Sequence, residues 1–325
     1  MNFSASGRAT CLLLARMPIL AAAPAARTIA SRPAQRFDGR GDAWAAVLIG
    51  SRLPEIAFHE FGFDGGLWVP LGQTAVLVAL AIVAAKRCPI QNLASFILAV
   101  AALSFGWLFA APWLASSNVI QSASHHLNLG GQLFLSRAVL TAGAVLMMFT
   151  LFGSGIGRRE LFLNVGNWRA PVQAEPFLQF RRTIPWTHFS AILLLIYGVA
   201  LPLYLYFTLH PQFGRADRLV TLLPWALATS IMNAANEEFQ FRSVLLARLK
   251  SVVTTREAII LTSVLFGISH YFGQPSGWGG VLMATAAGWM FAKSMVETRG
   301  FTCAFAIHFV QDMFVFGFLV MSTGA

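Results

Sequence analysis

Of the 325 residues in this chain, 57% are hydrophobic and only 11% are charged, well below the roughly 25% charged residues of a soluble domain, so the composition predicts a polytopic membrane protein. The net charge of +10 does not indicate binding to nucleic acid, because most basic residues lie in short connections between apolar runs, where the positive-inside rule places them. The three cysteines are odd in number and widely spaced, which predicts neither a disulfide framework nor a cysteine metal site.

Residues 1–66 are expected to form a basic, poorly defined leader. An apolar run from Cys11 to Ala23 resembles a signal peptide, but Arg16 interrupts it. A signal peptide, a disordered leader and a misassigned start therefore all stay open. Near its end the leader contains the sequence HEFGFD at 59–64, which lacks the second histidine of an HExxH helix, so a loop or interfacial turn is expected there.

From Leu67 onward, apolar runs recur that are long enough to cross about 30 Å of hydrocarbon. The sequence therefore predicts an all-α bundle of about eight transmembrane helices. The expected spans are 67–85, 91–114, 133–152, 187–208, 219–249, 257–272, 278–296 and 301–321. We divide them into N-terminal transmembrane helices at 67–218 and C-terminal helices at 219–321.

Arginine and lysine predict the orientation of these spans. Alternate connections are basic and belong on the cytoplasmic side; they are 86–87, 153–186, 248–256 and 293–299. The connections 115–132 and 273–277 contain no Lys or Arg. The basic leader contradicts this scheme unless it is cleaved or contains an extra inserted segment. The long connection 153–186 interleaves arginines with tryptophans and other apolar residues, so it is expected to lie in the interface.

Two adjacent acids, Glu237 and Glu238, interrupt the fifth apolar run. A carboxylate in hydrocarbon costs at least a few kcal/mol, so acids inside a span mark a functional site by default. On a helix Glu238 and Arg242 are one turn apart and can pair, whereas Glu237 is turned roughly 100° away. Glu238 is therefore expected to be paired with Arg242, and Glu237 to be left without a charged partner on its own helix.

The next spans add further ionisable residues. Phe266 and His270 are one helical turn apart, as are His308 and Asp312, so three helices offer polar groups that could face one cavity. Four other histidines are expected to be interfacial: His125 and His126 lie in a predicted loop, and His188 and His210 lie at the ends of predicted spans.

These residues lie in three stretches that resemble successive motifs of the CPBP family, which contains type II CAAX prenyl endopeptidases and bacteriocin-immunity-like intramembrane proteases. The stretches are NEEFQFRSVL, TSVLFGISH and AGWMFAKSMVETRGFTCAFAIHFVQD, matching EExxxR, FxxxH and HxxxN/D. They occur in the family's order, within residues 219–320.

The resemblance implies a role for each site residue. Glu237 would activate the attacking water with help from His270. Glu238 and Arg242 would orient the neighbouring site residues and neutralise charge in the site. His308 and Asp312 would bind the oxyanion or complete the site. Asp312 stands where the family often has Asn, and an ionised Asp cannot donate to an oxyanion, which makes His308 the safer donor.

We therefore expect an intramembrane endopeptidase of a bacterial inner membrane, with its site facing the cytoplasm. Its partners would be the lipid bilayer and a membrane-associated protein or peptide substrate, of which prenylated CAAX tails are one possibility. Two alternatives stay open: a non-catalytic immunity or scaffold protein on the same fold, and a transporter, for which a second half with broken segments is missing.

A cofactor is not determined by the sequence. Glu237, His270 and His308 could form the two-histidine, one-glutamate ligand set of a catalytic zinc. A metal-free site is slightly favoured, because no HExxH pair places two histidines one turn apart.

Overall fold

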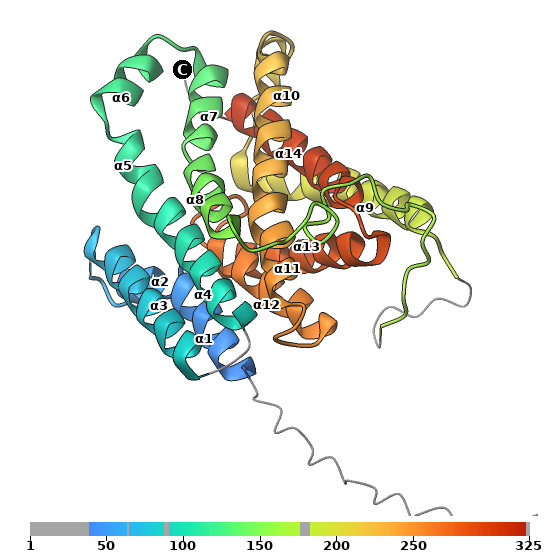
Figure 1. Cartoon of the computed structure of the whole chain (residues 1–325). Coiled ribbons are helices and arrows are strands. Elements are labelled where there is room, and N and C mark those ends of the chain that lie inside the picture. The colour runs from blue at the N-terminus through green and yellow to red at the C-terminus, as the bar shows by residue number, and fades with distance from the viewer. Residues whose placement is uncertain (1–38, 64, 88–90, 176–182, 323–325) are drawn as a thin grey trace, which may run out of the picture. The chain divides into compact units, whose positions relative to one another are not determined.

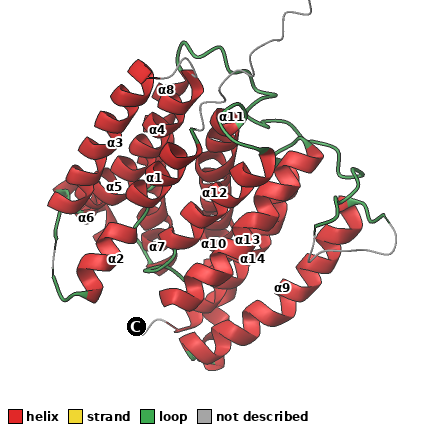
Figure 2. Cartoon of the chain, turned by 90° about the horizontal axis from the view of Figure 1, so that it is seen from below, coloured by secondary structure: helices red, strands yellow, loops and turns green. Residues whose placement is uncertain are grey.

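The computed structural model describes residues 39–63, 65–87, 91–175 and 183–322. Within these ranges the regular structure is helical and no strand occurs, apart from one isolated bridge between Pro171 and Pro185 (Figures 1 and 2). The expected all-α class is confirmed. The apolar run of the leader, from Cys11 to Ala23, lies outside the described residues.

The described N-terminal part of the chain forms helices that the sequence analysis did not assign. Helices α1 (Arg40–Gly50) and α2 (Leu53–Glu60) run alongside α12 (Thr255–Ser269). Arg40 bonds to Glu257 in the first turn of α12, and Glu60 bonds to Tyr271 just after its end. Together α1 and α2 therefore cross the same depth as α12.

A break at residues 51–52 separates α1 from α2, and a buried glutamine from the next helix closes it. Gln73 Nε2 donates to the carbonyls of Ile49 and Ser51 at 2.6 and 2.8 Å. Backbone groups that a helix break frees inside a bilayer need such protein partners, because no water is available there.

Helices from α3 to α8 form the rest of the N-terminal half. They are α3 (Trp68–Arg87), α4 (Gln91–Ser104), the π-helix η1 (Phe105–Ala110), α5 (Ala111–Ala115), α6 (Asn118–His125), α7 (Leu129–Ala138) and α8 (Thr141–Leu151). Gly143 of α8 comes so close to η1 that a Cβ on Gly106 would lie 2.4 Å from its Cα.

The C-terminal half contains the helices that carry the motif residues. It consists of α9 (Trp186–Leu209), the short η2 (Phe213–Arg215), α10 (Ala216–Glu238), the π-helix η3 (Phe239–Val244), α11 (Leu245–Leu249), α12 (Thr255–Ser269), α13 (Gly277–Thr298) and α14 (Thr302–Ser322). Helix α10 packs against α14, and α12 against α13. All eight predicted spans are thus helical.

Five helical segments among the described residues are long and apolar enough to cross a membrane. They are Trp68–Lys86, Asn92–Ala115, Leu129–Leu151, Trp186–Leu209 and Thr302–Ser322. The predicted spans at 219–249, 257–272 and 278–296 do not meet this criterion. Helix α12 has only 15 residues, and α10 and η3 carry the buried charges. The count of eight is therefore approximate.

The basic connections lie on one face of the bundle, as the charge pattern predicted. Asn92 bonds to Ser251 at 2.5 Å, Arg248 donates to the Thr150 carbonyl at 2.6 Å, and Arg256 lies 3.6 Å from Glu175. The contact between Arg40 and Glu257 places the start of α1 on this same face. The start of α1 and the start of α3 therefore lie at opposite ends of the bundle, with α1 and α2 running between them.

The connection between α8 and α9 packs on the C-terminal helices. Trp168 Nε1 donates to Thr302 Oγ1 at 2.8 Å, and Trp186 Nε1 donates to Glu297 at 2.9 Å. Gly166, with φ +77°, approaches Gly300 so closely that a Cβ on Gly166 would lie 2.7 Å from the Gly300 Cα. The described part of this segment is a loop, and its position in the membrane interface stays a prediction.

Candidate active site

A widened helical turn holds the first motif. Glu237 and Glu238 end α10, and Arg242 lies in the π-helix η3, a feature often found at functional sites. Arg242 Nη1 lies 3.0 Å from Glu238 Oε1, and both side chains are fully buried. The guanidinium also lies 3.8 Å from the centre of the Phe266 ring. The predicted pairing of Glu238 with Arg242 is confirmed.

His308 of α14 connects the two glutamates. Its Nδ1 lies 2.8 Å from Glu238 Oε1, and its Nε2 lies 3.5 Å from Glu237 Oε2. The ring stacks on Phe291 with its plane at 12° and its centre at 4.8 Å, which fixes the imidazole plane. Glu238 Oε1 therefore forms an ion pair with Arg242 and a hydrogen bond with His308 Nδ1. Glu237 is 3% exposed, and its Oε2 makes no hydrogen bond.

Asp312 lies one turn beyond His308. Its Oδ1 is 3.7 Å from His308 Nε2, and its Oδ2 accepts a hydrogen bond of 3.0 Å from Asn233 Nδ2. Asn233 stands one turn before Glu237 on α10, so it shares the face that meets α14. The sequence analysis missed Asn233, although its position four residues before the first glutamate could have indicated it.

A second missed element is an amide chain behind the glutamates. Gln240 Nε2 donates to Asn236 Oδ1 at 2.6 Å, while Gln240 Oε1 accepts from Trp107 Nε1 at 2.8 Å. Both amides are buried. This chain ties η3 to η1 of the N-terminal half and thereby fixes the turn that carries Arg242.

His270 directly follows the last residue of α12 and packs against the Phe266 ring. Its Nδ1 bonds to the Phe266 carbonyl at 2.8 Å, and its ring centre lies 4.4 Å from that of Phe266. If Nδ1 carries the proton for this bond, Nε2 is left as an acceptor.

His270, His308 and Asp312 open into one cavity of about 260 Å³ between α9, α13 and α14. Its other walls are largely apolar and include four alanines, and its polar members also include Gln311; the lining is Tyr197, Ala200, Leu201, Tyr204, Phe266, His270, Gln274, Pro275, Met283, Ala284, Ala286, Ala287, His308, Gln311, Asp312 and Val315. Five of the six predicted site residues are thus linked by contacts, and His270 joins them across this cavity. Apolar walls with a few converging polar groups are typical of ligand sites.

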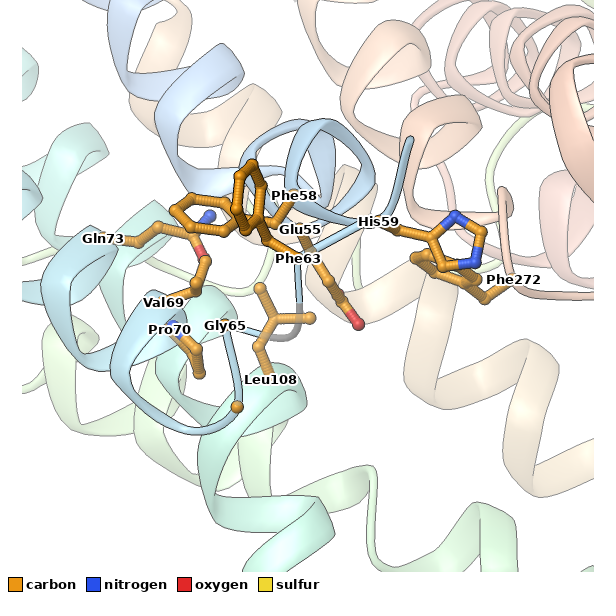
Figure 3. A pocket seen from close by; sticks show the side chains of 11 residues that line it. Glu55, Phe58, His59, Phe63, Gly65, Val69, Pro70, Gln73, Leu108 and Phe272 are labelled. Atoms are coloured by element: carbon orange, nitrogen blue, oxygen red, sulfur yellow. The ribbon is translucent and has the colours of Figure 1, made fainter. Parts of the chain in front are cut away.

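A second cavity, of about 320 Å³, lies between α2 and α3 and contains no motif residue (Figure 3). Glu55 and His59 of α2 line it, and the His59 ring meets Phe272 edge-on at 5.5 Å. His59 and Glu60 end α2, and a turn follows at 61–62. Asp64 of the HEFGFD segment lies outside the described residues.

The alternative zinc site would take its ligands from Glu237, His270 and His308. Among the described residues, no group of three or more His, Cys, Asp and Glu side chains is arranged to hold a metal ion. His308 Nδ1 is engaged by Glu238, and Glu237 and Asp312 both face its Nε2. As placed, Glu237, His270 and His308 are not grouped around one point that a metal ion could occupy. Whether the protein requires one stays a prediction.

Comparison with known proteins gives one match. Residues 219–314 match the family model described as type II CAAX prenyl endopeptidase Rce1-like. No curated protein and no solved structure matches. All six site residues lie inside the matched region, and the apolar helices around them make this an integral membrane protein. Over residues 219–314, which carry all six site residues, the chain is therefore similar to the Rce1-like type II CAAX prenyl endopeptidases.

Proposed function

We propose that the protein is an endopeptidase that hydrolyses a peptide bond of a membrane-associated substrate, with Glu237 activating the attacking water. The observation that carries the proposal is the state of Glu237, a buried carboxylate with one oxygen unbonded and 3.5 Å from His308 Nε2. Burying a carboxylate without a hydrogen-bonding partner costs free energy of folding. General-base catalysis needs such a free acceptor close to the reacting water.

The two histidines would serve the reaction in different ways. His270, with Nδ1 bonded to the Phe266 carbonyl, would use Nε2 to accept a hydrogen bond from the water. His308, with Nδ1 bonded to Glu238, would in its imidazolium form donate from Nε2 to the developing oxyanion. A base of this kind typically contributes about 10²–10⁴-fold in rate and an oxyanion donor about 10²–10³-fold.

In the reaction, Glu237 would remove a proton from water as the oxygen attacks the peptide carbonyl. The C–O bond forms while the carbonyl electrons move to the oxygen, which His308 stabilises. Collapse of this intermediate breaks the C–N bond, and the proton held by Glu237 passes to the leaving amine. Water supplies every atom added, so the step needs no further reactant.

The remaining site residues would position Glu237 and His308. Glu238 orients His308 and is neutralised by Arg242 at 3.0 Å. Asp312 accepts from Asn233 and faces His308 Nε2, which suits an orienting role better than donation to an oxyanion. This assignment removes the difficulty raised by Asp at a position where the family often has Asn.

The substrate and the membrane are also proposals. Prenylated CAAX tails are the substrates that the family's description suggests, and the largely apolar cavity walls are compatible with a lipidated peptide. We place the protein in a bacterial inner membrane with its basic connections in the cytoplasm. His308 then lies about 9 Å along α14 from its start on the basic face, six residues at 1.5 Å each. Labelling of single cysteines placed in 248–256 from either side of the membrane tests this orientation.

Glu237→Gln tests the enzymatic proposal, because it keeps the shape of the side chain and removes its basicity. We expect cleavage to fall to background while thermal stability is retained. Glu160→Gln, an exposed glutamate in the loop after α8, is the matched control and should retain full activity. The readout is the set of C-terminally shortened membrane proteins in cells that express each variant. Cleavage by the Glu237→Gln protein at the wild-type rate would refute the proposal, and identical sets with all three proteins would favour the non-catalytic alternative.

A further inference from the structure

The cavity between α2 and α3 contains none of the groups that the proposed reaction uses. It encloses about 320 Å³, and its walls come from α2, the turn after it, the first part of α3, Leu108 of η1 and Phe272 after α12. Among the described residues that line it, Glu55 is the one carboxylate, and no Lys or Arg occurs. A cleft lined by negative charge attracts cations, so this cavity suits a cationic ligand better than an anionic one.

A buried acceptor in the cavity wall lacks a partner. Gln73 lines the cavity and is 6% exposed, and its Oε1 accepts no hydrogen bond from the described residues. Its Nε2 donates to the carbonyls of Ile49 and Ser51. Exchanging the two amide atoms would set an oxygen against two carbonyl oxygens, so the unsatisfied atom is fixed as an acceptor. A buried acceptor left unpaired costs free energy, and a ligand that donates a hydrogen bond to it would remove this cost.

Glu55 supplies a second acceptor, which carries charge. Its side chain is 42% exposed, and its Oε2 lies 3.5 Å from Arg52 Nη1. That separation exceeds the roughly 2.7–2.9 Å of a charge-assisted hydrogen bond, so the carboxylate can still take a closer donor. In the view of Figure 3, Glu55 extends between Leu108 and Phe272. The cavity therefore offers one charged acceptor and one neutral acceptor.

Aromatic rings complete the walls. Phe58, Phe63 and Phe272 line the cavity, and all three are exposed, so part of each side chain is accessible to a ligand. A cation within about 6 Å of the centre of such a ring is attracted by its π-electrons. A primary ammonium group donates three hydrogen bonds, whereas a quaternary ammonium group donates none and would leave Gln73 Oε1 unsatisfied. A primary ammonium group therefore matches the acceptors and the rings together.

The cavity lies at the end of the bundle opposite the basic connections. Glu60, the last residue of α2, bonds to Tyr271 just after the end of α12. Phe61 and Trp68 beside the cavity are 78% and 82% exposed, and exposed aromatic side chains of membrane proteins gather at the membrane–water interface. We therefore expect the cavity to lie at the level of the lipid headgroups.

We propose that the cavity between α2 and α3 binds a primary ammonium group, with the Glu55 carboxylate and Gln73 Oε1 accepting its hydrogen bonds and the phenylalanine rings contacting it. The ethanolamine headgroup of a phospholipid and a soluble organic amine both present this group, and the experiment separates the two sources. The inference does not depend on the reaction at Glu237, because no motif residue lines this cavity.

Isothermal titration calorimetry on the purified full-length protein tests the proposal. The probe is dihexanoylphosphatidylethanolamine below its micelle concentration. Dihexanoylphosphatidylcholine is the comparison, because its quaternary ammonium group donates no hydrogen bond. We expect the ethanolamine lipid to bind about 10- to 100-fold more tightly, as for hydrogen bonds to a charged group. Phosphoethanolamine, which has no acyl chains, identifies the source: an affinity close to that of the lipid assigns the site to a soluble amine, and a much weaker one assigns it to the lipid headgroup.

Two variants locate the ammonium group in this cavity. Glu55→Gln keeps the shape of the side chain and removes its charge, so the affinity for the ethanolamine compound that binds should fall about 10-fold or more. Phe63→Leu should lower the same affinity about 2- to 30-fold, the range of a cation–π contact. The matched controls are Glu160→Gln and Phe61→Leu, which change exposed residues outside the cavity lining and should leave the affinity unchanged.

Binding of the choline lipid as tightly as the ethanolamine lipid, or no binding of either ethanolamine compound, would overturn the proposal. An unchanged affinity in a folded Glu55→Gln protein would also overturn it, because the ammonium group would then bind elsewhere. If Glu55→Gln does not fold, Phe63→Leu decides, since Phe63 is exposed and its replacement should leave the fold intact. An unchanged affinity in that variant would then overturn the proposal.

Discussion

Among the described residues, Glu238 contacts two basic side chains, Arg242 and His308. Replacing Arg242 by alanine leaves only the His308 ring. The guanidinium is fully buried, 3.0 Å from the carboxylate and 3.8 Å from the Phe266 ring centre. Breaking a buried pair on one side costs about 3–5 kcal/mol, and loss of a desolvated cation–π contact costs about 2 kcal/mol. We therefore expect the free energy of unfolding to fall by about 5–7 kcal/mol, with activity lost as well.

Reversible unfolding in mixed micelles with increasing SDS, followed by far-UV circular dichroism, measures this loss. Arg158→Ala, an exposed arginine, is the control and should stay within about 0.5 kcal/mol of wild type. Removing both charges, with Arg242→Met and Glu238→Gln together, should recover at least about 2 kcal/mol relative to Arg242→Ala, because no uncompensated charge is left. An Arg242→Ala protein of wild-type stability, or a double variant no more stable than it, would refute the structural role assigned to this arginine.

Two further changes follow from the same geometry. Gly288→Ala should destabilise by about 1–3 kcal/mol, because its Cβ would lie 2.9 Å from Arg242 Nη2, whereas Gly279→Ala in the same helix has nothing within 4 Å and should be neutral; equal unfolding curves for the two would contradict this contact. Metal analysis should find no stoichiometric zinc in active protein, and a strong chelator should leave activity intact. About one zinc per chain, lost in both His270→Ala and His308→Ala, would instead make these histidines ligands.

The site was largely predictable because placing ionisable side chains inside an apolar span costs free energy. Charged and imidazole side chains inside apolar runs are few, so Glu237, His308 and the others were identified from the sequence, and helical spacing predicted the pair of Glu238 with Arg242. Helical spacing gave no information about contacts between helices. That His308 bridges both glutamates depends on how α14 packs on α10, and the neutral amide Asn233 is common enough in any sequence to attract no attention.

The fold was less predictable at its N-terminal side. Hydropathy finds a span by its uninterrupted apolar length, and α1 with α2 has Arg52 and Glu55 at its centre and a break at residues 51–52. Helix α1 packs on α3, α4 and α12, and Gln73 bonds to the carbonyls that the break leaves free. Such partners lie outside the window that a hydropathy scan reads. The same limit applies to η3, since a π-turn depends on tertiary contacts and has no period of its own in the sequence.

The interrupted crossing has a consequence for how the nascent chain enters the bilayer. Until α3 supplies the Gln73 amide, the carbonyls of Ile49 and Ser51 would face lipid unbonded, at a cost of several kcal/mol each. We therefore expect residues 40–60 to wait at the translocon and to insert together with 68–87 as a helical hairpin. Chains truncated before residue 68 and fused to a glycosylation reporter should fail to place their C-terminal end across the membrane, whereas chains that include α3 and α4 should hold the segment in its final position. Efficient insertion of the shorter chain would show that the segment needs no partner.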